Sequence, residues 1–420
     1  MNVCKENKHT FFVDEVNNIS KSYDQFVYDL NSINQIKKYV FNKNPYEVFL
    51  GLICALVHRV PITLIDYDFS EKELNNIGLN KEVVLEKITV PCADFKDIIE
   101  VFEVLLSNVE RTSITLYTSG TTGRPKKVEH TLKSLIRTTK IADQYKKNVW
   151  GLTYNPTHFA GVQVFLQAFF NENTIVNLFH SDLMKIDESF SENKITNISG
   201  TPTFYRLLTS RCKDVHPYVR FVTFGGEQYD INIVEKLKAI FPKAKFINIY
   251  ASTEAGALFR THSDYFSIDE SLKKYIKISD NGELLIHKAI LGKSIDLRLN
   301  EDWYNTGDIV QLVGENQFKF VSRKNEMINV GGYKVNPNEI EKCIMDINGV
   351  KNVLVYGRKN RITGNIIAAD VVVNEDIEID KFENSIVDYL KDRLQDWKIP
   401  RIIKFVDNIE LTRSGKKVRK

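Results

Sequence analysis

Apolar residues between positions 114 and 250 fall into short runs of strand length, separated by longer stretches with helical spacing. The strand-like runs are "SITLY", "VWGLTY", "NTIVNLF", "ITNIS", "VRFVTF" and "KFINIY". The stretches between them are "HTLKSLIRTTKIADQY", "HFAGVQVFLQAFF", "PTFYRLLTS" and "INIVEKLKAI", each with apolar residues on one helical face. This alternation predicts an α/β fold in which helices cover a parallel-rich sheet.

The pattern changes after residue 256. The runs "NGELLIHK", "SIDLRL" and "NQFKFVSR" are short and separated by turns, which predicts a small β subdomain. From residue 323 a helix that starts at a proline ("VNPNEIEKCIMDI"), two strands ("VKNVLVYG", "NIIAADVVV") and a second helix ("FENSIVDYLKDRL") predict an α+β module of about a hundred residues. We therefore expect a large domain over 1–322 and a small domain over 323–420.

Charge and cysteine content exclude several classes of protein. The net charge of the chain is +3, and the basic excess lies in the segment 321–420, which has nineteen basic and fifteen acidic residues. An excess of this size is too small to indicate nucleic-acid binding. The five cysteines are far apart and form no CxxC pair, which predicts neither a disulfide framework nor a zinc site. No apolar run reaches the roughly 18 residues that span a bilayer, and no export signal is evident, so we expect a cytoplasmic protein without a membrane span.

Three turn sequences rich in small or polar residues follow predicted strands: "TSGTTGRPK", "GGEQ" and "ASTEAG". Ligands of such sheets bind at the carboxyl ends of the strands, and a glycine loop with hydroxyls and a lysine can hold phosphate. The first loop differs from a P-loop, because Arg124 and Pro125 separate Gly123 from Lys126 and no Ser or Thr follows that lysine. By itself the loop could also be a solvated surface segment.

Further motifs resolve this ambiguity. "YTSGTTGRPK", "NIYASTEAG", "WYNTGD", "SRKNEMINVGGYKVNPNEIE" and the terminal "LTRSGKKVRK" occur in this order between residues 116 and 420. The set resembles the adenylate-forming superfamily, which comprises acyl- and aryl-CoA synthetases, nonribosomal peptide synthetase adenylation domains and luciferases. The resemblance implies an enzyme that uses ATP and Mg²⁺ to convert a carboxylic acid into an acyl-adenylate. The acyl group then passes to a phosphopantetheine thiol of CoA or of a carrier protein.

The resemblance also implies roles for individual residues. Phosphate binding falls to Thr118, Ser119, Gly120, Thr121, Thr122, Gly123 and Lys126. The nucleotide site further includes Gly226, Glu227, Asn248 at the adenine edge, Tyr250 against its ring, Thr253 at the α-phosphate, Asp308 at the ribose and Arg323 beside it. Glu254 would hold Mg²⁺, and the acid would contact His158, Phe159, Gly225 and Gly256. The residues implied in catalysis are Lys416, Thr253, Glu254 and His158.

Two of these assignments have open alternatives. Lys416 aligns with the lysine that bridges the carboxylate and the α-phosphate, although the tail could equally be a solvated basic end. His158 resembles an aromatic gate at the thiol tunnel, or it could cap the helix that follows. In this family the small domain rotates between two poses, and the hinge position is Asn325 here instead of Asp or Lys. The phosphate loop also begins early, which indicates a trimmed N-terminal subdomain.

The acid and the acceptor are less well defined. Amino-acid-activating relatives carry an aspartate just after the position of "NPTHFAG", where this chain has no acid, so we expect a substrate without an α-ammonium group. "GGEQ" nevertheless resembles the amino-acid branch and keeps an amino-acid ligase open. Arg358, Lys359 and Arg361 would suit an acidic carrier protein, the 3′-phosphate of CoA or plain solvent. A catalytically silent nucleotide-binding protein is the alternative of another class.

Overall fold

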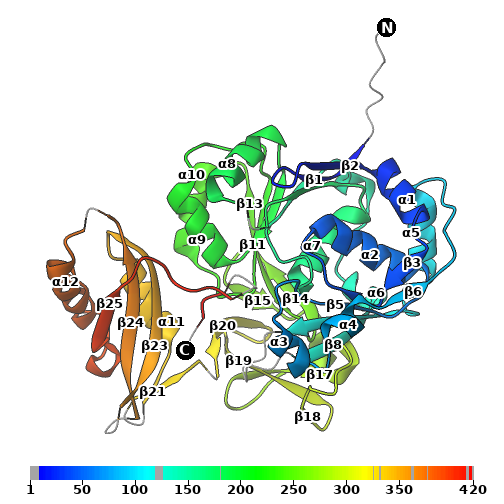
Figure 1. Ribbon diagram of the computed structural model, residues 1–420. Coiled ribbons are helices and arrows are strands. Elements are labelled where there is room, and N and C mark those ends of the chain that lie inside the picture. The colour runs from blue at the N-terminus through cyan, green and yellow to red at the C-terminus, as the bar shows by residue number, and fades with distance from the viewer. Residues whose placement is uncertain are drawn as a thin grey trace.

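The computed structural model describes residues 9–118, 126–179, 181–324, 326–330, 333–360, 364–375, 377–412 and 416–418. Its elements form three parts (Figure 1): sheets covered by helices, an antiparallel β subdomain below them, and a C-terminal unit to one side. The predicted fold class, a sheet-rich α/β domain with a small C-terminal domain, is confirmed. No helix in the described part of the chain is long and apolar enough to cross a membrane.

An eight-stranded sheet forms the centre of the first part. Its order is β14 (Gly256–Thr261), β13 (Lys245–Ser252), β12 (Phe221–Gly225), β11 (Asn197–Gly200), β9 (Val149–Leu152), β10 (Thr174–Asn177), β1 (Thr10–Asp14) and β2 (Ile19–Ser22). The strands from β13 to β1 are parallel, and the two edge strands are antiparallel to their neighbours. The sequence pattern did not identify β1, which brings the N-terminal segment into the sheet.

Helices cover both faces of this sheet (Figure 1). They are α1 (Tyr23–Asn31), α2 (Pro45–Val57), α5 (Ile98–Ser107), α7 (Phe159–Phe169), α8 (Leu183–Glu192), α9 (Pro202–Arg211) and α10 (Ile231–Ile240). Phe49 of α2 stacks on Phe165 of α7 with ring centroids 4.1 Å apart, in the core that joins α1, α2, α5 and α7. A second apolar core lies under α8, α9 and α10. Burial of these aromatic and aliphatic side chains fixes the strand ends on which the cavity is built.

A smaller sheet carries the glycine loop. Its order is β4 (Tyr39–Val40), β5 (Ile62–Leu64), β7 (Ser113–Thr118) and β8 (Lys126–Thr131). Thr118 pairs with Lys126 across β7 and β8, so the loop leaves and re-enters at one point. Residues 119–125 and the side chain of Thr118 lie outside the described residues, and the positions of Ser119, Gly120, Thr121, Thr122 and Gly123 remain predictions. Short elements beside this sheet are β3 (Gln35–Lys37), β6 (Lys87–Thr89), α3 (Glu71–Asn76) and α4 (Lys81–Leu85).

The helix expected over 130–145 is largely absent. Only α6 (Leu132–Leu135) and a 3₁₀ turn (Asp143–Tyr145) form there. The main chain between them is held instead by side chains of α7 and the turn that follows it: Gln167 and Asn171 donate to Lys140 O at 3.0 and 2.8 Å. These side-chain hydrogen bonds satisfy the backbone polar groups without a helix, and the segment becomes a wall of the cavity.

The β subdomain is antiparallel throughout. It contains β15 (Tyr265–Ser267), β20 (Gln317–Arg323), β19 (Trp303–Leu312), β17 (Glu283–His287), β16 (Ile276–Ile278) and the short β18 (Leu299–Asn300). The expectation of a strand over "SIDLRL" was wrong except at its last residue, Leu299. Ile295 there is 97% exposed, so this segment buries no apolar face that would support a strand.

The C-terminal unit has its own apolar core. Its strands are β22 (Tyr333–Val335), β21 (Ile328–Val330), β24 (Gly364–Val373), β23 (Val350–Asn360) and β25 (Ile402–Phe405), and its helices are α11 (Pro337–Met345) and α12 (Ile379–Lys391). β20 ends at Arg323 and β21 begins at Ile328, so the predicted boundary after residue 322 falls at the end of β20. The hinge residue Asn325 lies outside the described residues, and the division at 322 stays a proposal.

Candidate active site

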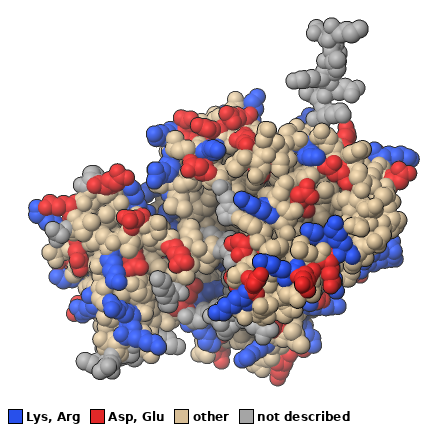
Figure 2. Space-filling model, in the orientation of Figure 1, with Lys and Arg blue, Asp and Glu red and all other residues tan. Residues whose placement is uncertain are grey.

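A cavity of about 910 Å³ opens at the carboxyl ends of β12 and β13. The surface is hollowed where the C-terminal unit meets the rest of the molecule (Figure 2). The side chains that line the cavity come from β8, α7, β13, the β subdomain and the C-terminal tail. The predicted site residues among them are Lys126, His158, Phe159, Gly225, Gly226, Tyr250, Thr253, Glu254, Asp308, Arg323 and Lys416.

Asp308 is the centre of a polar group on the β subdomain side. Its Oδ2 accepts a hydrogen bond from Tyr250 Oη at 2.5 Å, and its Oδ1 lies 2.8 Å from Arg323 Nε. The contact with Arg323 is an ion pair, and no described residue donates a hydrogen bond to the buried Oδ1. Burial and the neighbouring carboxylate of Asp308 raise the pKa of Tyr250. A buried carboxylate oxygen without a donor is costly, and it can accept from a ligand hydroxyl.

Lys416 enters the cavity from the opposite side, over the Gly225–Gly226 turn. Gly226 has φ +83°, and a Cβ at this position would lie 3.4 Å from Lys416 Cε. Burial in the cavity and the nearby charge of Arg323 lower the pKa of Lys416, while Glu227, Asp308 and Glu254 act in the opposite direction. The glycine therefore supplies both a left-handed turn and the room for the lysine chain.

The loop after β13 is held rigidly through its main chain. Thr253 O lies 2.7 Å from His130 Nε2, Glu254 O accepts from Gly292 N at 2.7 Å, and Ala255 O accepts from Arg137 Nη2 at 2.5 Å. These contacts use only carbonyl oxygens, and Thr253 and Glu254 both line the cavity. Fixed positions of this kind suit groups that must meet a developing charge.

The structure places a buried acid beside His158, which the sequence analysis missed. Asp66 follows β5, and its Oδ2 lies 2.8 Å from His158 Nε2, while Oδ1 accepts from Asn155 Nδ2 at 3.2 Å and from Thr157 Oγ1. The sequence around His158 has no acid, as stated above, but the fold brings the carboxylate of Asp66 to this position from 92 residues upstream. His158 stands at the N-cap position of α7, yet its side chain makes no capping hydrogen bond.

Three predicted site residues do not line the cavity. Asn248 lies two residues below Tyr250 on β13, and its Nδ2 donates to Ser263 O at 3.1 Å. Glu227 is turned toward the start of α9, where its carboxylate accepts from Thr203 N at 2.8 Å. Gly256 has φ +75°, and a Cβ there would lie 3.3 Å from Arg137 Nη2 and 3.5 Å from the Phe159 ring. Gly256 and Glu227 therefore contact residues next to the cavity without lining it.

Part of the cavity extends along α7, and sequence reasoning did not identify its walls. These are Thr138, Thr139, Trp150, Tyr154, Ala160, Gln163, Val164 and Gln167. Gln163 and Gln167 hydrogen-bond to the main-chain atoms of Leu135 and Lys140, so their amides are occupied. The signal in the sequence was the spacing of Phe159, Gln163 and Gln167, which puts two polar residues on one face of an otherwise apolar helix.

Known proteins share this chain's sequence and fold. A family model described as AMP-binding enzyme matches residues 60–286, and one described as AMP-binding enzyme C-terminal domain matches residues 339–416. A 2-succinylbenzoate–CoA ligase of Listeria innocua is 26% identical over 332 residues, covering 74% of this chain and 69% of that protein. Bacitracin synthase 3 of Bacillus licheniformis is 24% identical over 402 residues, covering 85% of this chain and 6% of that protein.

The solved structures include the o-succinylbenzoate CoA synthetase of Bacillus subtilis in complex with its acyl-adenylate intermediate. It aligns with a TM-score of 0.71 and 17% identity, covering 99% of this chain and 95% of that one. The matches confirm the predicted activity class, an AMP-forming acid–thiol ligase, and they disfavour the catalytically silent alternative. With a family model that covers more than half of its residues, the chain belongs to the AMP-binding enzyme family.

Proposed function

We propose that the chain joins a carboxylic acid without an α-ammonium group to coenzyme A through an acyl-adenylate. One observation carries the proposal: Lys416 reaches over Gly226 into the cavity that also contains the Asp308–Arg323 pair and the side chain of Glu254. The Lys416 ammonium, the Asp308 carboxylate for the nucleoside and the Glu254 carboxylate for the metal ion then all face the same cavity. This is the set of groups that attack of a carboxylate on a nucleotide α-phosphate requires.

The residues of the cavity fit ATP and Mg²⁺. The buried Asp308 Oδ1, to which no residue in the described part of the chain donates a hydrogen bond, would accept from the ribose hydroxyls. The Tyr250 ring would lie along the adenine, and Lys126 at the start of β8 would meet the phosphates that the glycine loop holds. The Glu254 carboxylate is a hard oxygen ligand suited to Mg²⁺, which when bound neutralises phosphate charge.

Lys416 would act in the first half-reaction. A carboxylate oxygen of the acid bonds to the α-phosphorus, and the bond from that phosphorus to the bridging oxygen of pyrophosphate breaks. The two reactants are both anions, and a lysine between them reduces their repulsion and neutralises the charge that develops on the α-phosphate. Thr253, held through its carbonyl by His130, would donate its hydroxyl to the same phosphate.

The part of the cavity along α7 favours an acyl or aryl acid. Trp150, Tyr154 and Phe159 supply apolar surface, and the amides of Gln163 and Gln167 are already bonded to the main chain. The acidic residues that line the cavity are Glu254, Glu283, Asp296 and Asp308, none of them on α7. Asp66 is occupied by His158, Thr157 and Asn155, so an α-ammonium there would compete with three donors.

The acceptor is proposed to be CoA, as the name of the Listeria innocua relative supports. In the second half-reaction the thiol sulfur bonds to the acyl carbon, the bond to the AMP oxygen breaks, and a base takes the thiol proton. His158 lines the cavity, and its Nε2 is held by Asp66, which leaves Nδ1 to accept that proton. A carrier protein is the alternative acceptor, recognised by Arg358 and Lys359, which are exposed at the end of β23, and by Arg361, which lies outside the described residues.

Pyrophosphate release tests the first half. The purified chain is given ATP, Mg²⁺ and a panel of acyl, aryl and amino acids without any thiol. We expect release with an acyl or aryl acid and weaker release with every amino acid. A clear preference for one amino acid would instead favour an amino-acid adenylating ligase, the alternative that the "GGEQ" turn keeps open.

CoA and carrier protein are then compared on the acid that the panel selects. We expect a thioester with free CoA. Loading of a phosphopantetheinylated carrier protein, combined with no turnover of free CoA, would contradict the proposed acceptor while leaving the adenylation step intact.

A further inference from the structure

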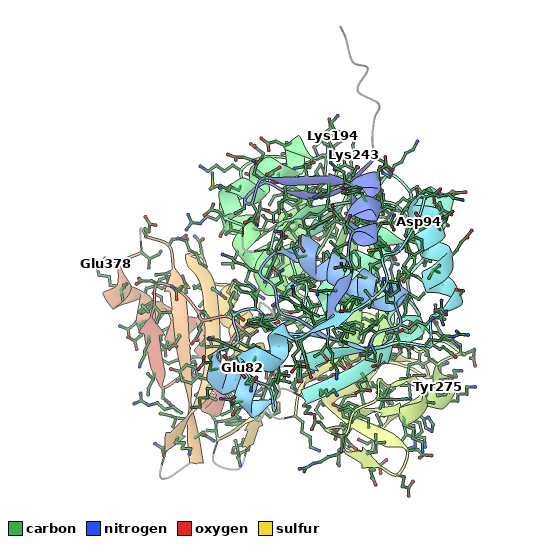
Figure 3. The ribbon with its side chains drawn as sticks, turned by 45° about the vertical axis from the view of Figure 1, so that its right-hand side comes forward. Glu82, Asp94, Lys194, Lys243, Tyr275 and Glu378 are labelled. Carbon is green, nitrogen blue, oxygen red and sulfur yellow. The ribbon has the colours of Figure 1, made fainter. Side chains whose placement is uncertain are left out.

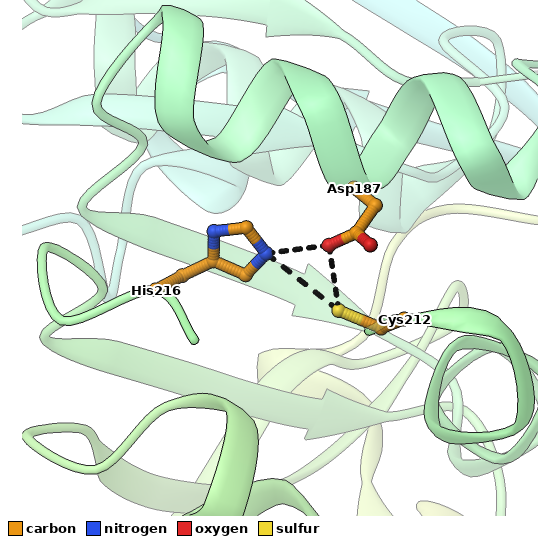
Figure 4. A group of neighbouring side chains, drawn as sticks. All are labelled: Asp187, Cys212 and His216. Atoms are coloured by element: carbon orange, nitrogen blue, oxygen red, sulfur yellow. Dashed lines mark hydrogen bonds and ion pairs between the residues drawn. The ribbon is translucent and has the colours of Figure 1, made fainter. Parts of the chain in front are cut away.

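A buried cluster of three different donor side chains lies outside the candidate active site. Asp187 is on α8, Cys212 is the C-cap residue of α9, and His216 precedes β12. Asp187 Oδ1 lies 2.6 Å from His216 Nε2 and 2.8 Å from Cys212 Sγ, and the sulfur lies 3.6 Å from that nitrogen (Figure 4). Asp187 is 4% exposed and His216 1% exposed, whereas Cys212 is partly exposed.

The cluster sits at the end of the sheet opposite the cavity. His216 N donates to Ile240 O at the end of α10, and β12 begins five residues later and ends at Gly225 beside the cavity. Lys194 and Lys243, which follow α8 and α10, mark this end at the top of Figure 3. The cluster therefore has no part in binding the acid or the nucleotide.

We propose that Asp187, Cys212 and His216 bind one transition-metal ion of the zinc class. The three donor atoms form a triangle with sides of 2.6, 2.8 and 3.6 Å. A point about 1 Å above its plane would lie about 2.1 Å from all three, close to the usual zinc distances of about 2.0–2.3 Å to oxygen, nitrogen and sulfur. An outward shift of the carboxylate oxygen by about 0.9 Å would open the two narrow angles to tetrahedral values.

The surroundings hold each donor in a binding orientation. The second carboxylate oxygen of Asp187 accepts from Lys213 N at 2.9 Å, so Oδ1 is the oxygen that faces the other two donors. The second ring nitrogen of His216, Nδ1, lies 3.3 Å from Ser191 Oγ, which can fix the ring tautomer. Hydrogen bonds of this kind to the far side of a ligand are typical of metal sites in proteins.

The donor set also selects the ion. A thiolate and an imidazole favour zinc and its neighbours over Mg²⁺, which prefers oxygen ligands, so the ion would differ from the one that serves the nucleotide. A divalent ion would balance the charges of the buried carboxylate and the thiolate. The fourth position would be open to water, because Cys212 is partly exposed, or to Asp214 O, which lies 3.7 Å from the sulfur.

The competing explanation is a hydrogen-bonded clamp without an ion. In that case the Cys212 thiol donates to Asp187, and His216 donates to the same oxygen.

The spacing of the three residues in the sequence also explains why the sequence predicted no zinc site: they are spread over thirty residues and contain no CxxC pair. A metal-binding measurement separates the two explanations.

The test is titration of the full chain with Co²⁺ after removal of metals by a chelator and under a reducing agent. We expect thiolate-to-cobalt absorption in the near ultraviolet that saturates at one equivalent, is displaced by Zn²⁺ and persists in excess Mg²⁺. Cys212→Ser should abolish this absorption. Cys343→Ser, which changes another partly exposed cysteine, in the C-terminal unit, should leave it unchanged.

Thermal unfolding of the unmodified chain gives a second measurement that needs no variant. One equivalent of Zn²⁺ should raise the unfolding midpoint by about 2–4 °C, because the ion binds the folded chain in preference to the unfolded one. The absence of stoichiometric Co²⁺ absorption in the unmodified chain would overturn the proposal and leave the hydrogen-bonded clamp. Equal loss of absorption in both cysteine variants would overturn it as well, since binding would then not depend on this cluster.

Discussion

Lys416→Ala is the perturbation whose effect the structure defines best. Lys416 reaches over Gly226 into the cavity. Burial and the charge of Arg323 lower the pKa of Lys416, so its positive charge stabilises the site little before the reaction begins. Its contribution should arise mainly as negative charge develops on the α-phosphate. Removal of one such donor costs about 2.7–4 kcal/mol, or about 10²–10³-fold in the rate of adenylation. Affinity for ATP should change less than about threefold, because the lost attraction to phosphate is offset by relief of repulsion with Arg323.

The assay is ATP–pyrophosphate exchange with the acid selected by the panel, accompanied by a separate measurement of ATP binding. Lys404→Ala on β25 is the matched control, since it removes an exposed lysine of the same unit and should leave exchange unchanged. Exchange within about tenfold of the unmodified chain would refute the role given to Lys416. Equal loss of ATP binding and exchange would also refute it, because the lysine would then act in the ground state.

Three further changes have defined outcomes. The rate of adenylation should fall as the pH rises through the pKa of Lys416, which is lowered below the ordinary lysine value of about 10.4. In a pH–rate profile, Lys416→Arg should move this fall to higher pH. Asp308→Asn should raise the KM for ATP by about 10–100-fold, as loss of a charged hydrogen bond does, with a smaller change in kcat. Asp66→Asn should leave pyrophosphate exchange within about threefold of the unmodified chain but slow thioester formation at least about tenfold. Stopped-flow quenching can measure the two steps separately, and equal slowing of both would contradict the role of His158.

The sequence predicted the parts of the fold and site that depend on local pattern. The predicted helix "HFAGVQVFLQAFF" and the predicted strands "VRFVTF" and "KFINIY" correspond to α7, β12 and β13, and some of the residues in the ordered motifs line the cavity. It could not predict Asp66 beside His158, because that contact joins two sheets and depends on tertiary packing alone. The main chain around Lys140 was expected to be helical, but hydrogen bonds from a neighbouring helix overrode its propensity.

The end of the tail that carries Lys416 is joined to the C-terminal unit. Thr412 N donates to Lys416 O at 2.6 Å, and the next residue, Lys417, forms a buried ion pair with Glu341 of α11 at 2.9 Å and donates to Val353 O. Burial lowers the pKa of Lys417, and Glu341 opposes that shift.

A buried ion pair costs several kcal/mol to break, so Lys416 should move as a rigid part of the C-terminal unit. In the described part of the chain, side-chain hydrogen bonds between the units include Asn232 Nδ2 to Asp346 Oδ1 at 2.9 Å, on an exposed surface where a hydrogen bond is worth little. Asn336 Nδ2 also donates to Val321 O at 3.1 Å, close to the point where the two units join. A rotation of the unit about the segment after Arg323 would therefore withdraw Lys416 from the cavity without unfolding its tail. The same cavity could then admit a thiol to the acyl-adenylate, on the side where Asp66 holds His158.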